Sequence, residues 1–542
     1  MTETTAGTTG KNQNREVFSS RAAFIFAAVG SAVGLGNIWR FPYVAYESGG
    51  GAFLIPYLVA LLTAGIPLLF LDYALGHRFR GSAPKVFRRI KAWSEPVGWL
   101  QVGIAFFITV YYSVIIAWAA IYSWKSINKT WGDDANAHFF EDFLQVNTSS
   151  ITSLDFVPPI AITLLVVWLL VIGVLALGVD KGIGMVSKIF IPLLVVLFLA
   201  VVIFALFLDG AAVGLNEFFT PNWAALSDSQ VWIAAYGQIF FSLSVAFGIM
   251  LTYASYLKPR SNLTGTGLVT AFANSSFEVL AGIGVFATLG FMATQANVPV
   301  DEVVSGGIGL AFIAFPTVIS QMPGVLGSIF GVLFFVSLTV AGFTSLMSLF
   351  EVVVSAVQDK FDLARTQTVL ILGFVMTLLA MVLFPTTTGI VSLDIMDRWT
   401  NQIGIVGVAL ISIIVLDWIL RRTDEFGMHI NAVSSFKVGT WWRICVANIT
   451  PIVLGYTLLQ EVIARIQEPY EGYSNAQLLI FGWGVIGIII VGSLVMTVLP
   501  WRGDHYLDGP PGSDFGVRPA HRLQPKAPKL AASDPSVTTK EN

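Results

Sequence analysis

Long apolar runs separated by short polar segments fill the chain from about residue 22 to residue 499. A helix needs about 20 largely apolar residues to cross a bilayer. The pattern therefore predicts an all-α, polytopic membrane protein with twelve transmembrane helices. The helices are expected near residues 22–46, 52–78, 97–127, 156–177, 184–208, 230–257, 262–292, 324–361, 366–385, 391–421, 437–463 and 475–499.

Two of the connecting segments, 209–229 and 300–322, are long enough to be ordered. The second contains an apolar stretch from Ile308 to Ile319, which is too short and too often interrupted by glycine and proline to span a bilayer. We expect this stretch to form a re-entrant or surface helical hairpin.

Composition agrees with a chain whose main solvent is lipid. The 542 residues are 55% hydrophobic and only 12% charged, and no soluble core can bury that share of apolar surface. We expect the lipid bilayer as a partner and, at a net charge of −3, no nucleic acid. The single cysteine, Cys445, rules out an intramolecular disulfide. The five histidines show no metal-ligand spacing and the spans carry no nucleophile motif, so we predict no catalytic residue, no enzyme and no organic cofactor.

Lysine and arginine are concentrated in alternate loops. Segments 78–91 and 421–443 and both terminal segments are rich in them, whereas the other loops hold little more than Lys125, Lys129 and Arg465. Because cytoplasmic flanks carry the excess of positive charge, we predict a cell-membrane protein with both termini in the cytoplasm. The polar first residues lack the apolar core of a removable signal peptide.

Two predicted spans are interrupted by small and polar residues. Gly30, Gly34 and Gly36 lie within seven residues of the first span, and each glycine costs a helix about 1 kcal/mol. Small residues also serve close helix packing, so glycine alone leaves a break undecided. The sixth span has a matching interruption, because residues 244–248 align with residues 32–36. The match predicts two broken helices at the starts of two inverted five-helix repeats.

Opposed breaks of this kind suit an amino-acid zwitterion. Unwound carbonyls and helix C-terminal ends are partially negative and can hold Na⁺ and an ammonium group, whereas helix N-terminal amides attract a carboxylate. Such a site needs no formal side-chain charge inside the membrane, where a charge costs several kcal/mol.

Four motifs occur in the order and spacing of one family. They are residues 32–42 (AVGLGNIWRFP), residues 49–56 (GGGAFLIP), the pair Tyr111 and Tyr112, and residues 341–345 (AGFTS). From about Arg15 to Val498 the chain thereby resembles the neurotransmitter:sodium symporter family. The resemblance implies a 5+5 inverted repeat with discontinuous helices 1 and 6, followed by two further helices. It divides the chain into a cytoplasmic N-terminal segment (1–20), a first repeat (21–209), a second repeat (210–421) and helices 11 and 12 (422–499). The cytoplasmic tail (500–542) is rich in Pro, Gly, Lys and Asp and poor in large apolar residues, so we expect it to be disordered.

The resemblance implies two binding sites for Na⁺, which we expect as the coupling ion, one or two per cycle. The first site falls on Ala32, Asn37, Ser242 and Asn274, together with the substrate carboxylate. The second falls on Gly30, Val33, Ala341, Thr344 and Ser345. Largely neutral oxygen shells suit a monovalent ion better than a divalent one.

The implied substrate site lies between the two breaks. The substrate carboxylate should meet the amides of Leu35 and Gly36 and the hydroxyl of Tyr112. The ammonium should meet carbonyls near Ala32, Phe241 and Ser244, with Ser242 beside them. The substrate side chain should contact Ile108, Phe241, Ser244, Phe247, Ser345 and Leu349.

Gates follow from the same resemblance. Arg40 and Asp397 should pair across the outer vestibule, above Phe247 and Tyr112. Arg15 and Asp359 are the inner counterpart, with Tyr256 nearby. Charges that meet in one state and part in another supply the two-state element that alternating access requires. The family's usual inner tryptophan is Phe18 here, which puts that indole contact in doubt.

Glu278 predicts independence from chloride. Chloride-dependent members of the family place a serine at this position, and a carboxylate there can supply the negative charge that chloride otherwise brings. Tyr57, Gln238, Ser242 and Asn274 are expected around it. The intramembrane carboxylates Asp72 and Glu351 are expected to satisfy unwound backbone, with a role in proton coupling left open.

Together these observations predict Na⁺-coupled import of a small neutral, apolar amino acid by alternating access. In its twelve spans and C-terminal extension the chain resembles the bacterial methionine and alanine importers of the family, which favours methionine or alanine as the substrate. Whether a small membrane accessory subunit is required stays open. A proton-coupled transporter of the same fold is the nearest alternative, but it would place a titrating group such as lysine at the second cation site. An ion channel is a further alternative, although no selectivity-filter motif is present.

Overall fold

The computed structural model describes residues 16–147, 150–303 and 307–502. Within these ranges the chain is almost entirely helical, and its β contacts are two isolated bridges, Gly50 with Pro221 and Phe156 with Thr386. The all-α prediction is therefore confirmed. The predicted disordered tail lies outside the described residues from position 503 onward, as does most of the N-terminal segment.

Ten continuous helical stretches in the described ranges are long and apolar enough to cross a membrane. They are Gly51–Phe79 (α3, Leu54–Ala60, and α4, Ile66–Phe79), Ala92–Asn128 (α6, Glu95–Asn128), Pro158–Ala176 (α8), Val179–Leu206 (α9, Met185–Leu206), Leu263–Ala296 (α13), Gly324–Phe361 (α16), Arg365–Leu383 (α17), Gly389–Ile419 (α18, Gly389–Trp399, and α19, Val406–Ile413), Thr440–Gly472 (α21, Thr440–Ile444, and α22, Thr450–Gln467) and Asn475–Val498 (α23, Asn475–Gln477, and α24, Gly484–Val498).

Two further spans are broken, at the positions predicted for helices 1 and 6. Helices α1 (Arg21–Ala32) and α2 (Leu35–Glu47) are bent by 52° at a two-residue break. Helices α11 (Ser229–Ser242) and α12 (Ile249–Ala254) are separated by residues 243–248. With α1 and α2 counted as one bent span, up to eleven membrane-length helices are present in the described ranges, and α11 and α12 lie where the sixth of the twelve predicted spans was expected.

Backbone conformation accounts for the break between α11 and α12. Ser244 (φ 52°), Ala246 (φ 66°) and Gly248 (φ 92°) all have positive φ. For a residue with a Cβ this region costs about 1–2 kcal/mol, and it cannot continue a right-handed helix. The Ala246 amide, freed from the helix ladder, donates to the Asp72 carboxylate at 2.8 Å. The prediction that Asp72 satisfies unwound backbone is confirmed.

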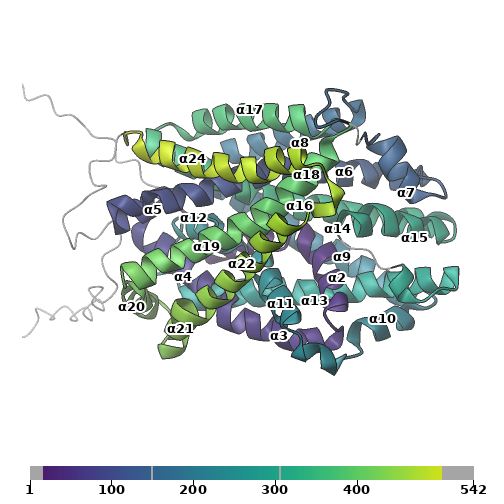
Figure 1. The fold of residues 1–542 in the computed structure, drawn as a ribbon, viewed down its shortest axis with the longest axis horizontal. Coiled ribbons are helices and arrows are strands. Elements are labelled where there is room, and N and C mark those ends of the chain that lie inside the picture. The colour runs from purple at the N-terminus through teal and green to yellow at the C-terminus, as the bar shows by residue number, and fades with distance from the viewer. Residues whose placement is uncertain (1–15, 148–149, 304–306, 503–542) are drawn as a thin grey trace, which may run out of the picture.

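Helices α6 and α16 form the most extensive contact between any two elements and carry much of the buried core. Other helices surround them, and α17 and α24 lie along one edge of the molecule (Figure 1). The outward faces of α8, α9, α17 and α24 expose large apolar side chains such as Leu169, Val196, Phe374 and Ile488. Exposed aliphatic and aromatic side chains at this density are expected where lipid is the solvent.

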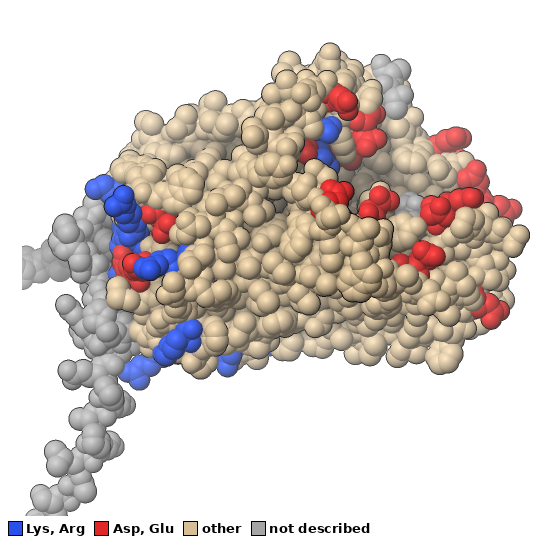
Figure 2. Space-filling view, turned by 60° about the horizontal axis from the view of Figure 1, so that its bottom comes forward, with Lys and Arg blue, Asp and Glu red and all other residues tan. Residues whose placement is uncertain are grey.

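Charge separates the two ends of the molecule. Lys and Arg gather at the end that carries α5 (Ala83–Ile90) and α20 (Thr423–Val433), whereas most visible Asp and Glu lie at the opposite end, near α10 (Ala211–Phe219) (Figures 1 and 2). We call them the basic end and the acidic end.

The two loops predicted to be ordered are helical at the acidic end. Segment 209–229 contains α10 and a short 3₁₀ turn. Segment 300–322 contains the helix Gly307–Gln321, formed by α14 (Gly307–Gly309), a π turn and α15 (Phe315–Gln321), and it is too short to be a span. Both short helices at the basic end, α5 and α20, were not predicted.

Candidate functional site

Helix α1 ends at Ala32 in the middle of the protein, and its last carbonyls point away from any continuing helix. The Ser244 hydroxyl donates to the Ser31 carbonyl at 3.2 Å. The Ser345 hydroxyl is shared between the Gly30 and Ser31 carbonyls, at 3.3 and 3.2 Å. One helix end, the second break and α16 therefore meet at a single group of buried oxygens. Partially negative helix ends of this kind attract cations.

Helix α2 starts after a two-residue break, at Leu35, with its amides directed into the same region. The Leu35 amide donates to the Tyr112 hydroxyl at 3.2 Å, and the Gly34 amide donates to Asn37 Oδ1 at 3.0 Å. Gly36 lies against Phe241 so closely that a Cβ would approach the ring to 2.1 Å. The first turn of α2 thus offers an anion a helix N-terminus and a tyrosine hydroxyl.

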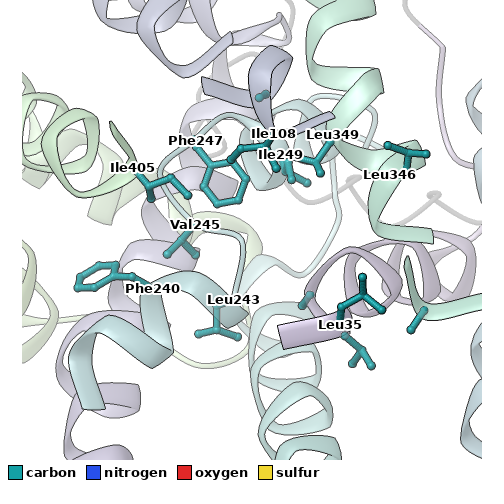
Figure 3. Close-up of a cluster of buried hydrophobic side chains, with 14 of the residues drawn as sticks. Leu35, Ile108, Phe240, Leu243, Val245, Phe247, Ile249, Leu346, Leu349 and Ile405 are labelled. Atoms are coloured by element: carbon teal, nitrogen blue, oxygen red, sulfur yellow. The ribbon is translucent and has the colours of Figure 1, made fainter. Parts of the chain in front are cut away.

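A cavity of about 790 Å³ joins the two breaks to the acidic end. It contains every residue predicted for the substrate site. The cavity is lined by Ala32, Leu35, Gly36, Ile108, Tyr112, Phe241, Ser242, Ser244, Phe247, Ser345 and Leu349, together with outer residues that reach the exposed Glu471. Figure 3 shows Phe247, Ile108, Ile249 and Leu349 gathered on one side, with Leu35 apart from them. The inner part of the cavity is therefore apolar on one side and rich in hydroxyl and backbone groups on the other.

A chain of hydrogen bonds joins the residues predicted for the first sodium site. Asn37 Nδ2 donates to Asn274 Oδ1 at 2.8 Å, and Asn274 Nδ2 donates to the Ser242 hydroxyl oxygen at 3.1 Å. The Ser242 hydroxyl in turn bonds to the Glu278 carboxylate. The structure brings these side chains together beside Ala32, at the end of α1.

The residues predicted for the second sodium site lie where α1 packs against α16. A Cβ added to Gly30 would be 3.3 Å from Thr344 Cβ, and Ser345 bonds directly to the Gly30 carbonyl at 3.3 Å. The Thr344 hydroxyl donates to the Ala341 carbonyl at 2.9 Å. The Val33 amide closes the last turn of α1 on Val29 at 2.7 Å.

Both groups of residues fit a monovalent cation. Their donors are neutral hydroxyl, amide and main-chain oxygens, the ligand type expected for an alkali ion. Over the part of the chain that the structure describes, no cluster of three or more His, Cys, Asp or Glu side chains could hold a metal ion.

Glu278 is fully buried and surrounded by hydrogen-bond donors. The Tyr57 hydroxyl donates to one carboxylate oxygen, and Gln238 Nε2 donates to the other at 2.6 Å. Ser242 supplies a further hydrogen bond, while Asn274 is one step removed, through Ser242. The structure therefore places a buried carboxylate next to the residues of the predicted first sodium site.

Arg40 and Asp397 face the same cavity but are not paired in this conformation. The Arg40 guanidinium lies over the Phe241 ring, 4.7 Å from its centre. Asp397 accepts a hydrogen bond from Asn401 Nδ2 at 2.7 Å. The cavity consequently stays open toward the acidic end.

Toward the basic end the cavity is closed by packed aromatic rings. Phe18 is buried and makes edge contacts with Phe24, Tyr253 and Tyr256. Its amide also donates to the Tyr256 carbonyl at 3.1 Å. A phenylalanine thus fills the position that the family usually gives to tryptophan.

The predicted inner-gate residues have other partners in the described part of the chain. Asp359 accepts from the Ser82 amide at 2.8 Å and lies 3.7 Å from Lys85 Nζ. The Tyr256 hydroxyl donates to Glu351 at 2.6 Å. Arg15 lies outside the described residues.

The prediction for Glu351 was wrong. Its carboxylate does not satisfy unwound backbone but forms a two-pronged ion pair with Arg365, at 3.0 and 2.7 Å. Arg365 also lies 3.7 Å from Glu16, on the segment that precedes α1. The pair is therefore part of the closure at the basic end.

Sequence reasoning missed three groups that line the cavity or close it. Ser31 has a buried hydroxyl without a hydrogen-bond partner, and only its place between Gly30 and Ala32 could have drawn attention to it. Tyr470 and Tyr473 bond to Asp394 from a loop about 76 residues further along the chain. Arg365 gave no signal, because a lone arginine after a span is ordinary on a cytoplasmic flank.

Comparison with known proteins assigns the chain to a family. A sequence profile described as the sodium:neurotransmitter symporter family matches residues 15–141 and 130–501. An uncharacterized sodium-dependent transporter of Methanocaldococcus jannaschii is 40% identical over 492 residues, covering 90% of this chain and 99% of that protein.

Two animal proteins are similar over most of their length. The sodium-dependent serotonin transporter of Drosophila melanogaster is 31% identical over 480 residues, covering 82% of this chain and 75% of that protein. The sodium- and chloride-dependent neutral and basic amino acid transporter B(0+) of Mus musculus is 30% identical over 561 residues, covering 91% of this chain and 86% of that protein. These relatives are transporters and not enzymes. This multi-pass membrane protein therefore belongs to the sodium:neurotransmitter symporter family, whose members couple solute transport to Na⁺.

Proposed function

We propose that the protein imports a small neutral amino acid, driven by Na⁺, by alternating access. The observation that carries this proposal is the break between α1 and α2. It places carbonyls that attract cations and amides that attract a carboxylate on two sides of one cavity. A zwitterion can satisfy both sides at once.

An apolar side chain is the best match for the rest of the inner cavity. Ile108, Phe247 and Leu349 form its apolar wall (Figure 3). The charged residues that line the cavity, such as Arg40 and Asp397, lie beyond Phe241 toward the acidic end. A formal charge on the substrate side chain would therefore have no partner in the inner part. Methionine and alanine are the substrates that we propose to test first.

The two groups of neutral oxygens support one or two coupling ions. A tenfold Na⁺ gradient supplies about 1.4 kcal/mol per ion, and a potential of 100 mV supplies about 2.3 kcal/mol per charge. Two ions would thus drive a neutral solute with roughly 7 kcal/mol, and one ion would still concentrate it several-hundredfold.

A proton-coupled mechanism is the main alternative. It would call for a titrating group at the second cation site, where this chain has Ala341, Thr344 and Ser345. Uptake that persisted without Na⁺ and rose with an inward proton gradient would favour this alternative.

Chloride independence is part of the proposal. The buried carboxylate of Glu278, with Tyr57 and Gln238 donating to it, occupies the place where a bound anion would otherwise be required. Uptake should continue at an unchanged rate when chloride is replaced by gluconate. Loss of uptake under that exchange would contradict the role given to Glu278.

The proposed orientation puts the basic end in the cytoplasm of the cell membrane. Phe18, near the first described residue, contacts Tyr256, and the Arg502 amide, at the last, donates to the Lys360 carbonyl at 3.0 Å. Lys360 pairs with Glu95, next to the basic helix α5. Both described ends therefore emerge at the basic end, which the positive-inside rule assigns to the cytoplasm. With the basic end in the cytoplasm, the cavity opens to the outside, so the described conformation is outward-facing. In this proposal the two five-helix repeats, 21–209 and 210–421, enclose the site.

Transport into liposomes tests the proposal directly. The purified protein should accumulate labelled L-methionine or L-alanine only when Na⁺ is higher outside, and a panel of unlabelled neutral amino acids should compete. Acidic and basic amino acids are the control competitors and should have little effect. Equal uptake in Na⁺ and in choline would overturn Na⁺ coupling, and steady leakage of Na⁺ without solute would point to a channel.

A further inference from the structure

The outer wall of the cavity contains a second guanidinium beside the predicted gate. Helix α18 carries Asp394, Asp397 and Arg398, and all three line the cavity together with Arg40. Asp397 is thus placed between two arginines, one across the vestibule and one adjacent in the chain. Each of them interacts electrostatically with its carboxylate.

Arg398 is held away from Asp397 by α22. Its Nε and Nη2 donate to the two carboxylate oxygens of Glu461, at 2.8 and 2.7 Å. Paired parallel hydrogen bonds between arginine and a carboxylate are among the strongest polar contacts in proteins. The Glu461 side chain is only 13% exposed, so solvent screens this pair less than an ordinary surface pair.

Neighbouring residues fix the same arrangement. The Tyr470 ring lies against the guanidinium groups of both Arg398 and Arg465, at 5.6 and 5.3 Å. Arg465 also reaches Glu461 at 3.4 Å. The Tyr473 hydroxyl donates to Asp394 at 3.1 Å, so the loop after α22 is tied to α18 one turn before the gate residue.

Asp397 forms no salt bridge with a cationic side chain among the described residues, although the charges of Arg40 and Arg398 act on it. It accepts from Asn401, and Arg40 lies over Phe241 instead of pairing with it. Besides Glu461, the carboxylate of Asp397 acts electrostatically on Arg398, whereas Asp394 already accepts hydrogen bonds from Tyr470 and Tyr473. A released Arg398 is therefore expected to turn to Asp397. Arg398 would then compete with Arg40 for the single negative charge that closure of the vestibule uses.

We propose that Glu461 is a positioning residue for the outer gate, because it holds Arg398 and so leaves Asp397 free to pair with Arg40. This inference rests on the proposed function, in which that pairing retains the substrate. It adds to the gate a residue from helix 11, outside the two five-helix repeats.

The first test compares three variants in proteoliposomes with L-methionine as the probe. E461Q frees Arg398 and should raise the KM for uptake about threefold to tenfold, with a similar rise in the rate of substrate release. E461Q/R398Q removes the competitor and should restore the KM to within about twofold of the wild type. R398Q alone should leave the KM unchanged, since Glu461 keeps Arg465 as a partner.

A matched control separates this role from general stabilisation. D424N also removes one carboxylate from an arginine pair, because Asp424 bonds to Arg443 at 2.7 Å near the basic end. It should leave the KM and the release rate unchanged. If R398Q raised the KM as much as E461Q, the pair would be a brace between helices and the proposal would be overturned. An unchanged KM in E461Q, with a wild type that transports, would overturn it too.

A structural measurement needs no substrate and therefore stands apart from the proposed function. A high-resolution electron-microscopy structure of E461Q should show the Arg398 guanidinium on the Asp397 carboxylate. Arg398 remaining against Gln at position 461, or turned into solvent, would refute the competition. Loss of uptake by the wild type itself would instead refute the proposed function.

Discussion

Gly36 illustrates how little space separates the two breaks. A Cβ at this position would lie 2.1 Å from Phe241 Cε1 and 3.0 Å from Cδ1, and Arg40 covers the same ring. Phe241 therefore cannot move aside without disturbing the outer vestibule. The close approach of helix 1 to helix 6 depends on the absence of a side chain.

Substitution G36A should abolish Na⁺-dependent uptake, to below about a tenth of the wild-type rate, because overpacking would separate the two breaks. The matched control is G173A, in the last turn of α8, where an added Cβ meets nothing within 4 Å. G173A should transport normally and be equally stable, since alanine favours a helix. Normal uptake by G36A, measured in proteoliposomes at matched protein content, would show that the contact is not required.

Glu278 gives a second prediction at the level of one residue. E278S removes the carboxylate but leaves donors from Tyr57 and Gln238. Uptake by E278S should fall at least about tenfold in gluconate, equivalent to about 1.4 kcal/mol, and recover when chloride is added. E278Q should be impaired in both media, because the amide neither carries charge nor leaves space for an anion. Chloride-insensitive uptake by E278S would contradict the charge-replacement hypothesis.

At the scale of elements, α20 is attached to α4 by a pair of buried histidines. His77 Nε2 faces the Lys258 carbonyl at 3.0 Å, and His77 Nδ1 faces His429 Nε2 at 2.9 Å. Since a carbonyl only accepts, His77 must donate through Nε2, and His429 must donate to His77 Nδ1. His429 Nδ1 is then a buried lone pair without a partner.

This arrangement predicts loss of stability in mild acid. Burial, and then the neighbouring His77 and Arg78, lower the pKa of His429 from its usual 6.5 to about 3. Between these values the unfolded chain binds a proton that the folded chain excludes, so stability is complete above about pH 6.5 and declines below it. The melting temperature in detergent should fall between pH 7.5 and pH 5.5. H429Q should show a smaller fall, and an equal fall in H429Q would assign the effect to other groups.

The two short helices that were not predicted could have been found in the sequence. In α5, buried Ala83, Phe87 and Ile90 recur with helical spacing, and in α20 so do Phe426 and Ile430. Their basic and polar surroundings identified them only as cytoplasmic loops. In contrast, the spans and both breaks were predicted, because hydropathy and paired small residues are local signals.

The partners of buried charges could not be predicted in the same way. Glu351 lies 14 residues from Arg365, and Glu461 lies 63 residues from Arg398. Each pair depends on which helices pack together in space, and the spacing of residues along the sequence does not show this. The residues of the proposed sodium and substrate sites were grouped around the two breaks only because the family resemblance supplied that juxtaposition.

At the scale of the whole molecule, the separation of charge makes the orientation testable. In a C445A background, D134C near the acidic end and K91C near the basic end are both exposed polar positions. An impermeant maleimide applied to intact cells should label D134C and not K91C. Both should react after permeabilisation. The reverse pattern would place the basic end outside and contradict the proposed direction of import.

The serine hydroxyls at the end of α1 have a consequence for how the transporter is loaded. Ser244 and Ser345 already satisfy the carbonyls of Gly30 and Ser31. A cation that binds to these carbonyls therefore replaces hydroxyl protons in an exchange of partners. Under the proposed function, this exchange would free the hydroxyl protons of Ser244 and Ser345 for the solute, so that the binding of one ligand would prepare the donors for the next.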